Sequence, residues 1–459
     1  MQDKTLLPRL FKGVIGVAVA DITPPEGICI SNWGAAGVQV ASGIHQPLFL
    51  HCITFQGSAE DKPWVLLSAD LGWWKNMYDE NDVRNYILNA LQIDESRLLF
   101  CLTHTHAGPS ICSFDTNLPG GELIRSYLET IKRKATEIIT TAVEQAQEGF
   151  LTWSKGRCAL AQNRDLYIAE KQRYVVGYNE KEIPDDTVLV GRITGEKNNT
   201  LAVIVNYACH PTTLAWSNTL ISPDFVGSMR ELVNTYVRAP VLFLQGASGE
   251  LAPADQYTGD IAVAEKNGRI LGFSVLSALQ CMGEAGYERV LSSVVESGAP
   301  LAVFSEKKIN DTTNAIQSRL MRIRFELKDQ TPIKEIKKQW EGETDVAVKE
   351  RLWRRMNIRS YLGEQSFTEI PVWIWKIGNT FIIGHPNEAY SLLQKTLRAH
   401  FPNINIVVIN IANGHIGYLP PEEFFDYNVY TVWQTPFARG SLERMTEQVQ
   451  KEIESMISD

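Results

Sequence analysis

Short apolar runs of strand length alternate along this chain with amphipathic stretches of helix length, and this alternation constrains the fold more than any other feature. Buried strands are predicted at residues 64–68, 98–102, 201–207 and 241–244. Helices are predicted at residues 78–91, 123–146 and 225–237. Because strands and helices alternate in this way in layered α/β proteins, we expect helices packed on β-sheet.

The last third of the chain adds an antiparallel element. Residues 371–375 and 380–383 have the pattern of a hairpin that turns at Gly378-Asn379. We also expect a strand at 320–327, a charged and exposed helical stretch at 333–361, a buried strand at 404–411 and a closing helix at 442–457. The predicted fold class is therefore α/β, a layered mixed α/β domain with mixed β-sheets flanked by helices. One domain is expected over residues 1–459, with 297–365 as a flanking or inserted helical and strand subregion.

Charge and cysteine content argue against some classes of protein. The formal net charge is -9 and no dense Lys/Arg run occurs, which argues against a nucleic-acid partner. The first residues lack the apolar core of a secretory signal, and no apolar run approaches the roughly 20 residues that span a bilayer. The seven cysteines are odd in number and form no CxxC pair, as in proteins with reduced thiols. We expect a cytoplasmic protein without a transmembrane segment.

Polar clusters follow four of the predicted strands, at 103–109, 209–213, 384–388 and 413–418. Strand ends meet at one edge of a layered α/β domain, where ligands usually bind. His104 and His106 would point to the same side of a strand, and two imidazoles with an oxygen ligand suit Zn²⁺. The residues alone leave a second interpretation open. The histidines could be hydrogen-bonded strand-end residues, His210 could cap a turn, and Glu388 could be a helix N-terminal carboxylate.

Read in order, several segments resemble the neutral/alkaline, non-lysosomal ceramidase family. Gly-Val-Ala-Val-Ala-Asp-Ile-Thr-Pro at 16–24 resembles the family's GxxxADITxP opening, and Thr-His-Thr-His-Ala-Gly-Pro at 103–109 its THTHSGP signature. Further similar segments are Ser-Ala-Asp-Leu-Gly at 68–72, Gln-Asn-Arg at 162–164, Cys-His-Pro-Thr at 209–212, Ile-Ser-Pro-Asp at 221–224, Pro-Asn-Glu at 386–388 and Gly-Tyr at 417–418. Their collinear order makes the resemblance specific.

Carried over residue by residue, the resemblance implies four zinc ligands, which are His104, His210, Glu388 and Tyr418. It implies that His106 and Tyr430 lie beside the metal and face the reacting carbonyl of the substrate. Arg164 would contact a substrate oxygen or hold the polar network of the site. Imidazole, carboxylate and phenol groups are all competent zinc ligands, so the chemistry of the residues agrees with the implied set.

Two departures from the family bear on mechanism and substrate. Where ceramidases have the serine of a Gly-Asp-x-Ser-Pro segment, this chain has Gly-Glu-Leu-Ala-Pro at 249–253, and Ala252 cannot act as a nucleophile. Ser248 lies nearby, and nothing in the sequence shows that it takes over this role. We therefore expect attack by metal-activated water, with His106 or Tyr430 stabilising the oxyanion. The chain is also expected to lack the β-sandwich that ceramidases carry after the catalytic domain, which disfavours a membrane-derived ceramide.

The sequence thus predicts a zinc-dependent hydrolase that cleaves an amide or related bond in a soluble substrate. The partner would be a small molecule, glycan-like or N-acylated, and the oligomeric state stays open. Two alternatives remain, a zinc-dependent glycan-processing hydrolase or lyase on the same site and a non-catalytic degenerate homologue. Some of Trp73, Trp74, Trp216 and Trp433 are expected to line the pocket, and His385 to orient Glu388.

Overall fold

The computed structural model describes residues 10–328 and 331–458. Its largest sheet has nine strands within these ranges, in the order β13-β11-β10-β6-β1-β3-β4-β5, with β17 beside β1. The strands are β1 (Leu10–Asp21), β3 (Phe49–Gln56), β4 (Trp64–Ala69), β5 (Leu98–Leu102), β6 (Gln147–Arg157), β10 (Thr187–Gly195), β11 (Thr200–Tyr207), β13 (Val241–Gln245) and β17 (Thr312–Thr313). The β4–β5 and β11–β13 pairs are parallel and most others antiparallel, so the sheet is mixed.

A second sheet packs face to face on the first. It has the order β18-β19-β20-β22, formed by β18 (Ile316–Glu326), β19 (Phe367–Ile377), β20 (Thr380–Gly384) and β22 (Asn405–Ile409). The predicted hairpin is confirmed, and Gly378 in its turn has a φ of 59°, which glycine adopts without strain. Leu66 and Ile204 of the first sheet share one apolar core with Trp375 and Ile382 of the second.

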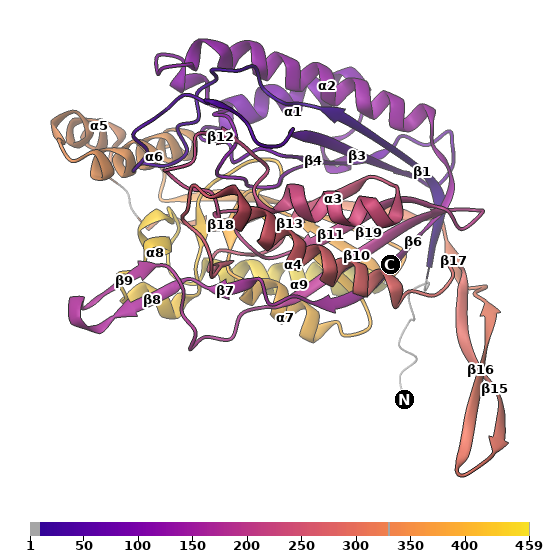
Figure 1. The fold of residues 1–459 in the computed structure, drawn as a ribbon. Helices are drawn as coiled ribbons and strands as arrows, with labels where there is room; N and C mark the ends of the chain where they lie inside the picture. Colours follow the sequence, from indigo (N-terminus) through magenta and orange to yellow (C-terminus); the bar gives the residue numbers. More distant parts are fainter. Residues whose placement is uncertain (1–9, 329–330, 459) are drawn as a thin grey trace.

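Helices cover the outer faces of both sheets, which gives the molecule four layers (Figure 1). The first sheet carries α1 (Met77–Leu91), α2 (Ile124–Glu144), α3 (Phe225–Val237) and α4 (Ile261–Gln280), and the second carries α7 (Leu392–His400) and α9 (Ser441–Ser458). Asn76 caps α1 by accepting a hydrogen bond from the backbone N–H of Asp79, and Asp260 caps α4 in the same way through Ala262. The predicted α/β fold class, with mixed sheets between helices, is confirmed.

Short strand pairs lie where the long strands end. They are β2 (Gly43–Ile44) with β12 (Leu220–Ile221), β7 (Ala161–Asn163) with β14 (Leu251–Pro253), β8 (Asp165–Ile168) with β9 (Arg173–Val176), and β21 (Glu388–Ala389) with β23 (Tyr418–Leu419). The last pair is parallel and places Glu388 directly opposite Tyr418. Two segments remote in sequence are thereby held side by side.

The region between α4 and β19 departs most from the sequence-based expectation. An unpredicted hairpin of β15 (Tyr287–Glu296) and β16 (Pro300–Lys308) projects from the body of the molecule (Figure 1). The single exposed helix predicted at 333–361 is two helices, α5 (Ile333–Gly342) and α6 (Val346–Leu362). The backbone breaks before Asp345, whose carboxylate caps α6, and α6 buries Asn357, Arg359 and Leu362. The expectation of an exposed stretch was therefore wrong for α6.

Among the residues that the structure describes, no helix has the length and apolar character needed to cross a lipid bilayer.

Candidate metal centre

His104 follows the end of β5 in an unusual backbone conformation. The strand stops at Leu102, and His104 has a φ of 71°, a left-handed value that costs a non-glycine residue about 1–3 kcal/mol. Its backbone N–H donates to Leu71 O at 2.9 Å, and its ring Nδ1 lies 3.1 Å from Gly72 O. The rings of His104 and His106 lie together, with centroids 4.9 Å apart. The rings of His104 and His106 are close together, as predicted. The reason given for this, the two-residue repeat of side chains along a strand, was wrong, because β5 ends before His104.

His210 is held in an equivalent way after β11. It is fully buried, its backbone N–H donates to Leu251 O at 2.9 Å, and its Nδ1 lies 3.1 Å from the same carbonyl. A carbonyl can only accept, so Nδ1 carries the proton in both His104 and His210. The neutral form of each ring then has a free lone pair on Nε2. Burial, followed by the charge of Arg164, lowers the pKa of His210 to about 3, which keeps this imidazole neutral.

The Nε2 atoms of both rings face the carboxylate of Glu388. Its Oε2 lies 2.8 Å from His210 Nε2 and 3.4 Å from His104 Nε2, and the side chain is 5% exposed. Although burial raises the pKa of Glu388, the neighbouring histidines hold it well below its usual value, so the group is ionised. Two acceptors that face each other at hydrogen-bond distance repel unless a proton or a cation lies beside both.

The geometry therefore fits a metal ion. Ligand atoms of His104, His210 and Glu388 all lie within 4.8 Å of one another, and all three residues are buried. Two imidazole nitrogens and one carboxylate oxygen form the donor set of many metal sites. In such sites each histidine donates its other N–H to a carbonyl or carboxylate, as both do here. The sequence-based prediction of a metal site at these three residues agrees with this arrangement.

Tyr418 and Arg164 complete one wall of the site. The Tyr418 ring is nearly parallel to that of His210, with centroids 6.5 Å apart, and burial together with Glu388 raises the pKa of its phenol well above the usual value. Arg164 Nη2 donates to Gly249 O at 2.7 Å and to Tyr418 Oη at 3.1 Å, and lies 3.3 Å from His210 Nε2. Arg164 thus joins Gly249, Tyr418 and His210 in one polar network.

His106 and Tyr430 are half-buried and line the same cavity as Glu388. Both ring nitrogens of His106 lack a hydrogen-bond partner among the described residues, and burial lowers its pKa well below the usual value. The Tyr430 ring lies 5.6 Å from that of Tyr418, and both residues, with His106, line a cavity of about 40 Å³ next to Glu388. A neutral imidazole and a phenol therefore face the space beside the carboxylate.

Comparison with known proteins shows the family to which the chain belongs. Residues 14–251, just over half of the chain, match the family described as neutral/alkaline non-lysosomal ceramidase, N-terminal. The chain belongs to this family. A neutral ceramidase of Pseudomonas aeruginosa is 26% identical over 220 residues, which are 46% of this chain and 32% of that protein. The matched part thus spans about a third of the length of the curated relative.

Solved ceramidase structures share the fold with nearly the whole chain. The crystal structure of the neutral ceramidase from Pseudomonas aeruginosa aligns with a TM-score of 0.66 at 16% identity, covering 96% of this chain and 73% of that one. A ceramidase complexed with C2 aligns with a TM-score of 0.67 at 16% identity, covering 96% of this chain and 74% of that one. At this identity the likeness shows the fold alone.

The segment 248–253 of this ceramidase-family chain, in which the position of the family serine is expected from the sequence, is buried. Ala252 is buried in β14, opposite Gln162 of β7. The Ser248 hydroxyl accepts a hydrogen bond from Gln245 Nε2 at 2.6 Å. Glu250, between them, accepts hydrogen bonds from the backbone N–H and the hydroxyl of Ser391, and burial raises its pKa to about 7.

Only some of the singled-out tryptophans reach the site of this family member. The Trp73 ring lies 4.7 Å from the His106 ring and 5.6 Å from the His104 ring, so it forms a wall of the cavity. Trp74 packs in the core against Phe100. Trp216 and Trp433 lie at the edges, beside Trp33 and Tyr430 respectively.

The sequence placed His415 near Tyr418, but it did not predict the contact of His415 with Glu388 or the presence of Arg354 at the site. His415 Nε2 lies 2.8 Å from Glu388 Oε1, a contact that had been expected of His385. His385 Nδ1 accepts instead from the Asn387 N–H at 3.3 Å. Arg354 of α6 lines the cavity, with its guanidinium 5.7 Å from the Trp73 ring centre. No motif marks Arg354, because its helix has the charge pattern of a solvated surface.

Proposed function

We propose that this family member is a zinc-dependent hydrolase that cleaves an amide or related bond in a soluble substrate. The observation that carries the proposal is the contact of the Nε2 atoms of His104 and His210 with the ionised Glu388 in a buried cavity. Two nitrogens and one oxygen favour zinc over magnesium or calcium, which prefer oxygen ligands. Tyr418, whose ring lies beside that of His210, is proposed as a fourth ligand.

A zinc ion held by these residues would polarise a substrate carbonyl and lower the pKa of a bound water to about 7. The residues of the chain supply the remaining functions. His106 is neutral and both of its ring nitrogens are unpaired, so its N–H is available to hydrogen-bond the oxygen of a reacting carbonyl. The phenol of Tyr430 lines the same cavity and offers a second donor. The Trp73 ring packs against the His106 ring and forms an apolar wall of the cavity.

Water is the proposed nucleophile because Ala252 carries no hydroxyl. Hydrolysis then forms the bond between the water oxygen and the acyl carbon, breaks the C–N bond, and transfers a proton to the leaving amine. Intact-mass spectrometry of the zinc-loaded protein during incubation with p-nitrophenyl octanoate tests this step. We expect no acylated protein. A stable acyl adduct on Ser248 or any other serine would contradict the proposal.

The reaction class is tested by the products. The zinc-loaded protein is incubated with N-acyl amines and N-acetylated sugars, and free amine is measured with fluorescamine, with His210→Ala as the control. Amine release by the wild type that is lost in His210→Ala supports an amidase. Release of reducing sugar without amine indicates a glycan-processing enzyme. A zinc-loaded protein that releases neither product from any of these substrates belongs with binding proteins.

A further inference from the structure

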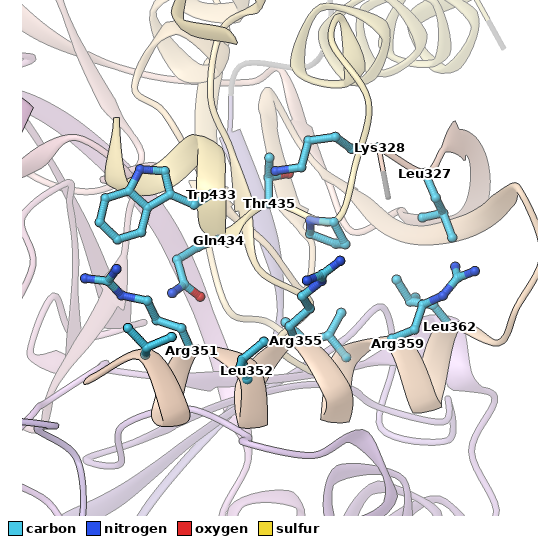
Figure 2. Close-up of a pocket in the computed structure, with 13 residues that line it drawn as sticks. Leu327, Lys328, Arg351, Leu352, Arg355, Arg359, Leu362, Trp433, Gln434 and Thr435 are labelled. Carbon is cyan, nitrogen blue, oxygen red and sulfur yellow. The ribbon is translucent and has the colours of Figure 1, made fainter. Parts of the chain in front are cut away.

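A second and larger cavity adjoins the metal centre. It has a volume of about 400 Å³ and lies between α6 and the segment 433–436, which includes the end of α8 (Tyr430–Gln434). Figure 2 shows Arg351, Arg355 and Arg359 on the face of α6 that looks toward Gln434 and Thr435. We call this cavity the arginine groove.

The arginine groove is cationic on an apolar base. Its described lining residues include three arginines and Lys328 but no aspartate or glutamate. Leu352, Leu362 and Pro436 supply apolar surface between the charges. The Arg351 guanidinium lies 4.1 Å from the ring centre of Trp433, which fixes one end of the groove. Such a lining fits a molecule that has both an apolar body and a negative charge.

Arg359 has unused hydrogen-bonding capacity inside this groove. It is 5% exposed, and its Nη1 donates to Gln365 O at 3.2 Å. Its Nε and Nη2 have no hydrogen-bond partner among the described residues. A buried donor without a partner costs about 1–3 kcal/mol, and more when it is charged. Nε and Nη2 form the edge of a guanidinium that binds a carboxylate through two parallel hydrogen bonds.

The arginine groove and the metal cavity meet. Ile358 and Gln434 line both of them. Arg354 lines the metal cavity and Arg359 the groove, and five residues of helix correspond to about 7.5 Å along the axis of α6. An apolar chain of a few methylene groups that passes Ile358 would therefore connect a group in the metal cavity near Arg354 with one at Arg359.

We propose that the arginine groove binds the carboxylate of an amphiphilic ligand through Nε and Nη2 of Arg359. In the substrate, an apolar chain separates this carboxylate from the bond that is cleaved. The second statement rests on the proposed hydrolase function, whereas the first does not. The two are therefore tested by separate measurements.

Binding is measured by isothermal titration calorimetry of the full chain with octanoate, octanol and sulfate, both as purified and after EDTA treatment. We expect octanoate to bind in both preparations and to bind more tightly than octanol or sulfate. Arg359→Gln should weaken the binding of octanoate roughly tenfold or more. Arg359→Lys should restore only part of the affinity, because lysine cannot make the two parallel hydrogen bonds of a guanidinium. The exposed Arg125→Gln is the matched control and should bind as the wild type does.

Two results would overturn the carboxylate site. One is equal octanoate affinity in the wild type and Arg359→Gln, and the other is octanol or sulfate binding as tightly as octanoate. If Arg359→Gln fails to fold, Leu352→Glu is the second test, since a negative charge placed in the groove should repel the carboxylate of octanoate and abolish its binding. Undiminished octanoate binding by Leu352→Glu would contradict the proposal.

The substrate part is tested with suberic acid monoamide and octanamide, which differ only in the terminal carboxylate. The zinc-loaded protein should hydrolyse the monoamide with the higher kcat/KM, and Arg359→Gln should remove the preference. Equal rates would overturn the substrate assignment. If neither amide is cleaved although octanoate binds, the hydrolase proposal fails and the carboxylate site stands.

Discussion

His415 Nε2 lies 2.8 Å from Oε1 of Glu388, while Oε2 of the same carboxylate faces His104 and His210. One oxygen of Glu388 is thus directed at the metal centre, and the other is fixed by a residue outside it. This division keeps the carboxylate in one orientation. It also makes His415 a positioning residue, whose loss should lower the affinity of the site for zinc.

The first prediction concerns this contact. His415→Ala should lower zinc affinity by about 10- to 100-fold, because residues that orient a metal-binding side chain typically contribute this much. The measurement is competition with a chromophoric chelator. His400→Ala is the control, since His400 pairs with Glu454 on the surface and should leave the affinity unchanged. Wild-type affinity in His415→Ala would refute the positioning role.

The second prediction concerns stability. Arg230 of α3 and Asp70, just after β4, form a buried bidentate pair, with both N–O distances 2.8 Å. Arg230→Met should destabilise the protein by about 3–5 kcal/mol, because it leaves the Asp70 carboxylate buried without its partner. Urea denaturation measures this difference. Lys266→Met breaks the exposed Lys266–Asp255 pair and should cost less than about 1 kcal/mol. Equal effects of the two substitutions would contradict the account.

The third prediction concerns pH. Burial raises the pKa of Glu80 to about 7, against the effect of Arg84, whose Nε donates to Oε1. The folded chain binds this proton more tightly than the unfolded chain. The stability contribution is therefore complete below about pH 4.5 and is lost as the pH rises toward 7, by up to about 3 kcal/mol. The free energy of unfolding of the wild type relative to Glu80→Gln should fall over this range. A difference that does not change with pH would show that Glu80 titrates normally.

From the sequence, strand ends predicted which segments would meet, and the resemblance to the ceramidase family predicted which of their residues would hold a metal. His104 and His210 follow β5 and β11, two strands of one sheet, and Glu388 follows β20 of the sheet packed on it. Because these strand ends lie near one another, residues directly after them come together. The alternation of strands and helices predicted the α/β layers, and the Gly378-Asn379 turn predicted the hairpin.

Contacts that depend on irregular backbone or on tertiary packing could not be predicted. Asn413 and Gly414 have φ values of 52° and 139°, and these conformations in the loop before His415 have no signature in a periodic pattern. The helix α6 has a charged sequence typical of an exposed helix. Its arginines instead face two cavities, because the segment after Tyr430 packs over them. The exposed hairpin of β15 and β16 has no buried face to produce a recognisable alternation.

The most direct test of the central claim is the metal content of the purified protein, measured by elemental analysis for the wild type, His104→Ala and His210→Ala. We predict about one zinc ion per wild-type chain and loss of the zinc in both variants, which should still fold. A wild-type protein that holds no zinc, even after zinc is added, would contradict the account of this site.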